Sequence, residues 1–149
     1  ASPNLIPMGP SDGTRVEILN RQMCFDLLAQ VPVGRIGVSI DALPAVLPVH
    51  FSLFDETVLL RTVPGTKLDT ATIGHVVAFQ ADGYEPLADT GWSVLLQGLA
   101  RAVSGQQARA NSVPIRSWDS GSAVRLVQIQ ATVLSGRRLL GADGGIGTH

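Results

Sequence analysis

The sequence predicts a mainly β protein with small helices, built as a six-stranded antiparallel β-barrel. Apolar and polar residues alternate along residues 33–40 and 92–103, which is the period-two pattern of strands with one buried face. Short polar links separate consecutive β segments, as expected for an antiparallel meander rather than a crossover fold. The chain has 149 residues, 45% of them apolar and 15% charged. That composition is sufficient for one domain with a substantial core.

The N-terminal part predicts an arm followed by a helix. Residues 1–14 are rich in Pro, Gly and Ser, so a loose arm is expected there. Asn20 is a good helix cap, and the apolar spacing predicts a helix over 21–30, with Met23, Leu27 and Leu28 on one face, that Pro32 ends.

The remaining elements are mostly strands. Six are expected, over residues 33–40, 45–53, 57–61, 76–80, 92–103 and 124–138. Turns are predicted at 41–44 and 55–56, a short helix after residue 67, a surface loop over 82–91, a second short helix over 106–112 and a flexible tail over 141–149. The folded domain is therefore expected to cover residues 15–140.

Composition excludes several classes of function. A net charge of −1 gives no basic surface for nucleic acid, and no apolar run approaches the roughly 20 residues of a membrane helix. No signal-peptide pattern opens the chain, so a cytoplasmic location is expected. The single cysteine, Cys24, excludes an internal disulfide, and its apolar neighbours favour a buried, inert thiol. The three histidines are widely spaced, so no metal site is expected.

The most informative chemical feature is the turn Arg61-Thr62-Val63-Pro64-Gly65-Thr66-Lys67, which contains the only lysine of the chain. The cations supply charge, the threonine hydroxyls supply directed donors, and the glycine lets backbone N–H groups approach closely, as a phosphate requires. The turn joins a predicted strand to a predicted helix N-terminus, which also favours an anion. The alternative is a solvated turn with an incidental lysine, and the local pattern does not separate the two.

Common catalytic motifs are absent. The sequence has no P-loop and no nucleophile elbow, and no pair of carboxyl groups stands in apolar surroundings. An anion site without catalytic side chains is typical of a protein whose cofactor carries the chemistry.

An ordered series of motifs resembles a known family. The series is Val33-Gly34-Arg35-Ile36-Gly37, Pro44-x-x-x-Pro48-Val49-His50-Phe51, Arg61-Thr62-x-x-Gly65-Thr66-Lys67-Leu68, Val77-Ala78-Phe79-x-x-Asp82, Thr90-Gly91-Trp92-Ser93-Val94-x-x-x-Gly98-x-Ala100 and Ser135-Gly136-Arg137-Arg138. Over residues 17–139 the chain resembles the pyridoxamine 5′-phosphate oxidase-like family of FMN-binding split β-barrels. The likeness is greatest to its small actinobacterial members and its nitroimidazole-resistance branch.

The resemblance implies a cofactor, a partner and a set of site residues. FMN is the implied cofactor, with its phosphate and ribityl chain held by Arg61, Thr62, Thr66 and Lys67. The flavin ring would lie along Leu47, Pro48, Val49 and His50. Family members are homodimers with two flavins at the interface, which would place Trp92, Ser93 and Gln97 near the partner's flavin. The implied activity is flavin-dependent oxidation or reduction of a small molecule.

Several alternatives remain open at the level of the sequence. His50 is the one candidate catalytic side chain, but it is equally compatible with a satisfied, partly buried imidazole. Trp92 is either a core or interface anchor or a stacking platform. The C-terminal Trp and Arg elements of true pyridoxamine phosphate oxidases are missing, which argues against that reaction. The competing functions are a deazaflavin (coenzyme F-420)-dependent reductase and a protein that binds flavin or haem without turnover.

Overall fold

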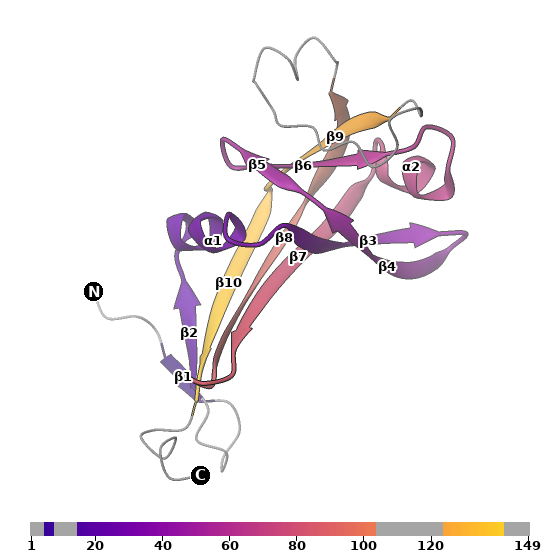
Figure 1. The fold of residues 1–149 in the computed structure, drawn as a ribbon. Helices are drawn as coiled ribbons and strands as arrows, with labels where there is room; N and C mark the ends of the chain where they lie inside the picture. Colours follow the sequence, from indigo (N-terminus) through magenta and orange to yellow (C-terminus); the bar gives the residue numbers. More distant parts are fainter. Residues whose placement is uncertain (1–4, 8–14, 104–123, 142–149) are drawn as a thin grey trace. The chain divides into compact units, whose positions relative to one another are not determined.

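The computed structural model describes residues 5–7, 15–103 and 124–141, and within them the chain is mostly β-strand with two small helices (Figure 1). The helices are α1 (Arg21–Leu28) and α2 (Lys67–Thr72). The strands are β1 (Leu5–Pro7), β2 (Arg15–Leu19), β3 (Val33–Ile40), β4 (Leu43–His50), β5 (Ser52–Phe54), β6 (Thr57–Thr62), β7 (Val76–Glu85), β8 (Thr90–Val103), β9 (Arg125–Gln130) and β10 (Val133–Leu140). No helix in this part of the chain is long and apolar enough to cross a membrane.

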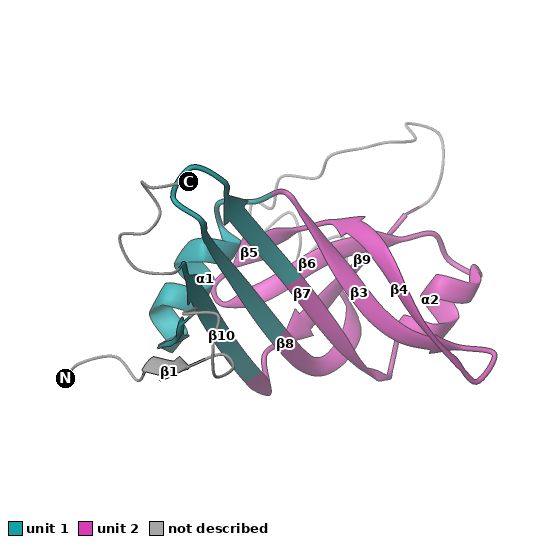
Figure 2. Ribbon diagram, turned by 90° about the horizontal axis from the view of Figure 1, so that it is seen from below, with its two compact units in different colours: residues 1–31, 81–95, 134–149 teal, residues 32–80, 96–133 magenta. Residues whose placement is uncertain are grey.

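The chain forms two compact units (Figure 2). Unit 1 draws on residues 1–31, 81–95 and 134–149, and unit 2 on residues 32–80 and 96–133. Strands β7 and β8 contribute residues to both units. The turn with the chain's only lysine belongs to unit 2.

Unit 1 pairs its strands in the order β1-β2-β10-β8-β7. Helix α1 begins as predicted, because the Oδ1 atom of Asn20 accepts a hydrogen bond of 2.9 Å from the N–H of Met23. The helix buries Cys24, Phe25, Leu27 and Leu28. Burial raises the pKa of the Cys24 thiol, an effect that the charge of Arg21 only partly opposes. The buried position expected for Cys24 is therefore confirmed, and its inertness stays a prediction.

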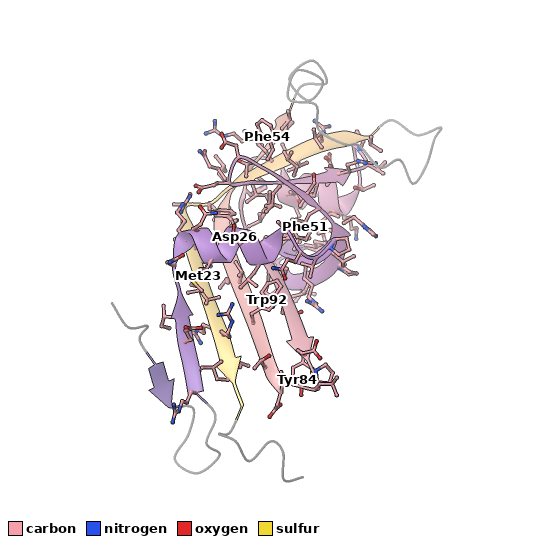
Figure 3. The ribbon with its side chains drawn as sticks, turned by 60° about the vertical axis from the view of Figure 1, so that its left-hand side comes forward. Met23, Asp26, Phe51, Phe54, Tyr84 and Trp92 are labelled. Atoms are coloured by element: carbon pink, nitrogen blue, oxygen red, sulfur yellow. The ribbon has the colours of Figure 1, made fainter. Side chains whose placement is uncertain are left out.

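Unit 2 pairs its strands as β7-β3-β4 and as β8-β9-β6-β5. Its core is formed by fully buried apolar side chains on these strands, among them Ile36, Val58, Leu60, Phe79, Leu96, Val127 and Ile129. Phe51 meets Phe79 edge to face at 4.7 Å between ring centroids (Figure 3). The ring of Phe79 also lies against the backbone of Gly34, where a Cβ atom would overlap it.

Two tight hairpins shape unit 2. Ile40 pairs with Leu43 across the turn at Asp41 and Ala42, and Phe54 pairs with Thr57 across the turn at Asp55 and Glu56. All four turn residues have positive φ angles between 51° and 66°, which is the geometry that matches the twist of flanking strands in two-residue hairpin loops. The turn at 55–56 was predicted from the sequence, whereas the turn predicted over 41–44 is limited to residues 41–42 because β4 begins at Leu43.

The strand predictions differ from the structure in several places. The predicted strand over 45–53 is divided into β4 and β5, that over 124–138 into β9 and β10, and the short strand β2 was not expected. The surface loop predicted over 82–91 is wrong, because β7 continues to Glu85 and β8 begins at Thr90. Its polar residues suit the exposed end of a hairpin, where Tyr84 donates a hydrogen bond of 3.0 Å to Asp89.

Other predictions fall outside the residues that the structure describes. These are the helix over 106–112, all of the expected arm except β1 and all of the expected tail except residue 141. The domain bounds therefore remain predictions. Helix α1 ends at Leu28, two residues earlier than expected.

Candidate functional site

The turn between β6 and α2 is built around the buried carboxylate of Asp69, which is 6% exposed. Thr62 donates its hydroxyl to Oδ1 of Asp69 at 2.8 Å, and the backbone N–H of Gly65 donates to Oδ2 at 3.1 Å. The two donors come from the beginning and the middle of the turn, so one side chain fixes the path of the backbone between them.

Arg125, the first residue of β9, completes this network. Its Nε atom lies 2.9 Å from Oδ1 of Asp69, and β9 places Arg125 directly opposite Thr62 in the ladder with β6. Burial alone raises the pKa of Asp69, but the hydrogen bonds from Thr62 and Gly65 and the charge of Arg125 outweigh it and lower the pKa. Asp69 is therefore ionised at neutral pH and neutralised locally by Arg125.

Thr66 caps α2 from the other side of the same turn. Its hydroxyl accepts a hydrogen bond of 3.2 Å from the N–H of Asp69 and donates one of 2.7 Å to the carbonyl of Val63. Both threonine hydroxyls predicted to face an anion are thus engaged within the turn in this structure. Their role toward a ligand remains a prediction.

The two cations of the turn have different surroundings. Arg61 is half-buried on β6 opposite Leu126, and it projects from the strand face opposite to that of its neighbour Thr62. Burial lowers its pKa, and within the described residues no carboxylate forms an ion pair with it. Lys67 is exposed, with its Nζ atom 2.9 Å from Oδ2 of Asp41, which is also exposed.

The strand predicted to face the flavin ring is β4, which pairs only with β3 among the described strands and leaves its other edge open. Its residues alternate as expected, with Leu47 and Val49 half-buried and Pro48 and His50 exposed. Pro48 lies opposite Arg35 in the ladder. Because proline has no N–H to donate, this must be a pair without mutual hydrogen bonds, and the backbone groups of Val46, Pro48 and His50 point to the open edge.

The residues predicted to lie near a partner's flavin are all on β8. Trp92 and Ser93 belong to unit 1 and are half-buried, whereas Gln97 is exposed in unit 2 and its carbonyl accepts the N–H of Thr132 at 2.9 Å. The indole of Trp92 lies over Gly83, where a Cβ atom would be 2.5 Å from Nε1. This packing within unit 1 favours an anchoring role for Trp92 over a stacking platform.

Three residues of the turn environment were missed in the sequence: Asp41, Asp69 and Arg125. Asp69 carried a usable signal, because Thr66-Lys67-Leu68-Asp69 fits the capping-box pattern at a helix start. Asp41 and Arg125 are 26 and 56 residues from their partners in the chain, so only the fold brings them to the turn. Within the described ranges, no three His, Cys, Asp or Glu side chains gather to hold a metal ion.

Comparisons with known proteins agree with the architecture. The uncharacterized protein Rv0080 of Mycobacterium tuberculosis is 34% identical over 146 residues, covering 93% of this chain and 95% of its own. The structure of the FAD binding protein from Mycobacterium smegmatis is 35% identical, covers 83% of this chain and 97% of its own, and has a TM-score of 0.66. A FAD-binding protein from Mesorhizobium loti shares the fold, with 20% identity, coverage of 85% and 98% and a TM-score of 0.68.

The family model for pyridoxamine 5′-phosphate oxidase matches residues 20–138. The predicted fold class, mainly β with small helices and of the split β-barrel type, is confirmed together with the family. The chain belongs to the pyridoxamine 5′-phosphate oxidase family.

Proposed function

We propose that this chain binds FMN and that Arg61 and Lys67 hold its phosphate. The observation that carries the proposal is the state of Arg61, a half-buried guanidinium whose pKa is lowered by burial and which has no carboxylate partner in the described part of the chain. A desolvated cation of this kind is stabilised by an incoming anion.

Lys67 is suited to join the same anion. Its present partner, Asp41, is exposed, so the ion pair between them is weak and can exchange for another. Gly65 has a φ of 85°, and apart from its two chain neighbours none of the described residues has an atom within 4 Å of the point that a Cβ atom would occupy there, so this side of the turn is open to a ligand.

The open edge of β4 offers complementary groups for the flavin ring. The outward N–H group of Val46 alternates with outward carbonyls, including that of Pro48, and β4 has no further strand partner among the described strands. A flavin ring carries both hydrogen-bond acceptors and an N–H donor, so it can form hydrogen bonds with these alternating backbone groups. Exposed His50 at the end of β4 is the proposed substrate-orienting side chain.

The proposed activity is oxidoreduction of a small molecule. A bound flavin supplies hydride transfer, so the chain itself has to bind, orient and shield the cofactor. The site suits a binding role, since the turn supplies positive charge for the phosphate and β4 supplies backbone hydrogen-bonding groups for the ring.

FAD is a second candidate for the cofactor, favoured by the 35% identical relative that is named for FAD binding. The exposure of Lys67 and Gly65 leaves room for a larger phosphate-bearing group at the turn. Mass spectrometry of the cofactor extracted from freshly purified protein separates FMN, FAD and coenzyme F-420, and an absorption spectrum without a flavin or deazaflavin band would contradict the proposal.

We also propose that the protein is a homodimer that completes the flavin site. Leu43 and Val46 on the edge strand β4 are 69% and 68% exposed, and apolar residues on an open edge are typical of a surface covered by a partner. Light scattering after size exclusion measures the mass. Val46→Lys is expected to give a monomer with weakened FMN binding, and an unchanged mass would contradict this assignment.

The phosphate assignment is tested with the double variant Arg61→Ala/Lys67→Ala. Loss of two charge-assisted contacts is expected to weaken FMN binding by about a hundredfold or more. The matched control is Arg101→Ala/Arg137→Ala, which removes the same charge from two exposed positions that are not part of the turn. Equal FMN affinity in the two double variants would refute the assignment.

A further inference from the structure

We propose that Asp69 is a positioning residue for the phosphate end of the cofactor, and that it acts by holding the 62–66 turn in its binding shape with Arg125 as its counter-ion. This inference rests on the proposed function, because it assumes that the phosphate binds at the turn. It goes further by assigning a role to two residues that make no proposed contact with the ligand.

Burying the carboxylate of Asp69 has an energetic cost. A buried carboxylate is expensive unless it is both hydrogen-bonded and paired with a cation. Asp69 meets that requirement with Thr62, Gly65 and Arg125 at 2.8, 3.1 and 2.9 Å. An apolar residue at position 69 would avoid the desolvation cost altogether, so stability alone gives little reason for an ionised group here.

The contacts of Asp69 fix the backbone of the turn at several points. Thr62 ends β6, Gly65 is the left-handed residue of the turn with a φ of 85°, and Thr66 caps α2. One carboxylate ties the first two together, and the N–H of the same residue is held by the third. The backbone from which Lys67 projects is thereby fixed before any ligand arrives, which lowers the entropic cost of binding.

The negative charge of Asp69 needs a counter-ion of its own. An unpaired Asp69 beside the turn would repel a phosphate and compete for the nearby cations. Arg125 compensates it from a different strand, β9, so that Arg61 and Lys67 remain available to the ligand. Arg125 is accordingly expected to affect phosphate binding although it comes from outside the turn.

The test compares FMN with riboflavin, which has the same ring but lacks the phosphate. Dissociation constants for both are measured by fluorescence quenching on the intact protein and on Asp69→Asn, Thr62→Val and Arg125→Gln. The matched control is Asp26→Asn on the exposed face of α1, where the carboxylate accepts a hydrogen bond from Gln22, one turn earlier on the same helix. Melting temperatures are recorded for every variant.

Asp69→Asn is expected to weaken FMN binding about tenfold, because its amide NH₂ cannot accept a hydrogen bond in place of the second carboxylate oxygen. Riboflavin affinity is expected to stay within about twofold of wild type, since riboflavin has no phosphate for the turn to hold. Thr62→Val keeps the shape of the side chain and is expected to give a smaller loss in the same direction, so it carries the test if Asp69→Asn does not fold.

Two results would overturn the inference. One is an unchanged FMN affinity in a folded Asp69→Asn or Thr62→Val protein. The other is an equal loss for FMN and riboflavin, which indicates a general structural role. If instead the proposed phosphate site is wrong, the wild-type protein itself is expected to bind FMN no better than riboflavin. The wild-type affinities therefore distinguish the two failures.

Discussion

Replacing Asp41 with Asn is expected to strengthen the binding of FMN. In the structure the carboxylate of Asp41 is paired with the only lysine of the chain, with 2.9 Å between Oδ2 and Nζ. A phosphate that binds Lys67 has to displace this carboxylate or bind beside it. Asp41→Asn removes the competitor and keeps the turn, because Asn accepts a φ of 52° as readily as Asp.

The magnitude follows from the exposure of the pair. The side chains of Lys67 and Asp41 are 76% and 70% exposed, and ion pairs in such surroundings contribute roughly 0.2–1 kcal/mol. Since about 1.4 kcal/mol corresponds to a factor of ten, we expect FMN affinity to rise by about 1.4- to fivefold. The gain should shrink at high salt, because exposed charges are screened over a few ångströms there.

The assay is a fluorescence titration with FMN and riboflavin at low and high ionic strength. Asp55→Asn is the matched control, since Asp55 occupies the same position in the other two-residue hairpin of unit 2, with a φ of 51°. Riboflavin affinity is expected to be unchanged in both variants. If Asp41→Asn binds FMN more weakly than wild type, or no differently from Asp55→Asn, then Lys67 is not a phosphate ligand.

Three further predictions concern stability. Ala42→Gly is expected to stabilise the protein by about 0.5–1 kcal/mol in urea unfolding, because Ala42 has a φ of 65° that favours glycine; a lower urea midpoint would contradict this. Gly34→Ala is expected to cost roughly 1–3 kcal/mol in the same assay, since its Cβ atom would overlap the buried ring of Phe79, and a neutral result would show that the ring moves. The pKa of Asp69 is lower in the folded than in the unfolded state, so its contribution to stability is present above the unfolded pKa and is lost as pH falls through the folded pKa. Melting temperature should therefore fall less on acidification in Asp69→Asn than in wild type, and parallel pH profiles would contradict the assignment.

The sequence was most informative where local chemistry decides the structure. Asn20 at the start of α1 and the hairpin turn at Asp55-Glu56 were predicted correctly, and the turn predicted over 41–44 has the right place but is two residues shorter. Caps and two-residue turns depend on few neighbouring residues. The alternation along residues 45–53 also predicted that Val46, Pro48 and His50 share one face of β4, and these residues are the more exposed ones. These signals were sufficient for the fold class.

The strand predictions that were wrong concern segments whose structure depends on residues far away in the sequence. The residues at 82–85 read as a polar loop, but Gly83 lies against Trp92 and the chain there continues β7. Strand β2 takes its register from β10, more than 100 residues away, so its short sequence carried little information. Tertiary pairing overrides weak local preference in both cases.

The cations at the turn do not by themselves decide how much positive charge a phosphate meets, because two of them are paired with carboxylates. Arg61, Lys67 and Arg125 exceed Asp41 and Asp69 by one positive charge, and the two carboxylates differ in burial. The buried carboxylate of Asp69 is held by hydrogen bonds from Thr62 and Gly65 as well as by Arg125, whereas both side chains of the Lys67–Asp41 pair are exposed and exchange readily. A phosphate carries nearly two negative charges at neutral pH, so Arg61 supplies one cation and only the exchange at Lys67 supplies a second. Phosphate binding at this turn is therefore expected to be strongest when Asp69 keeps its own counter-ion and Asp41 releases its lysine.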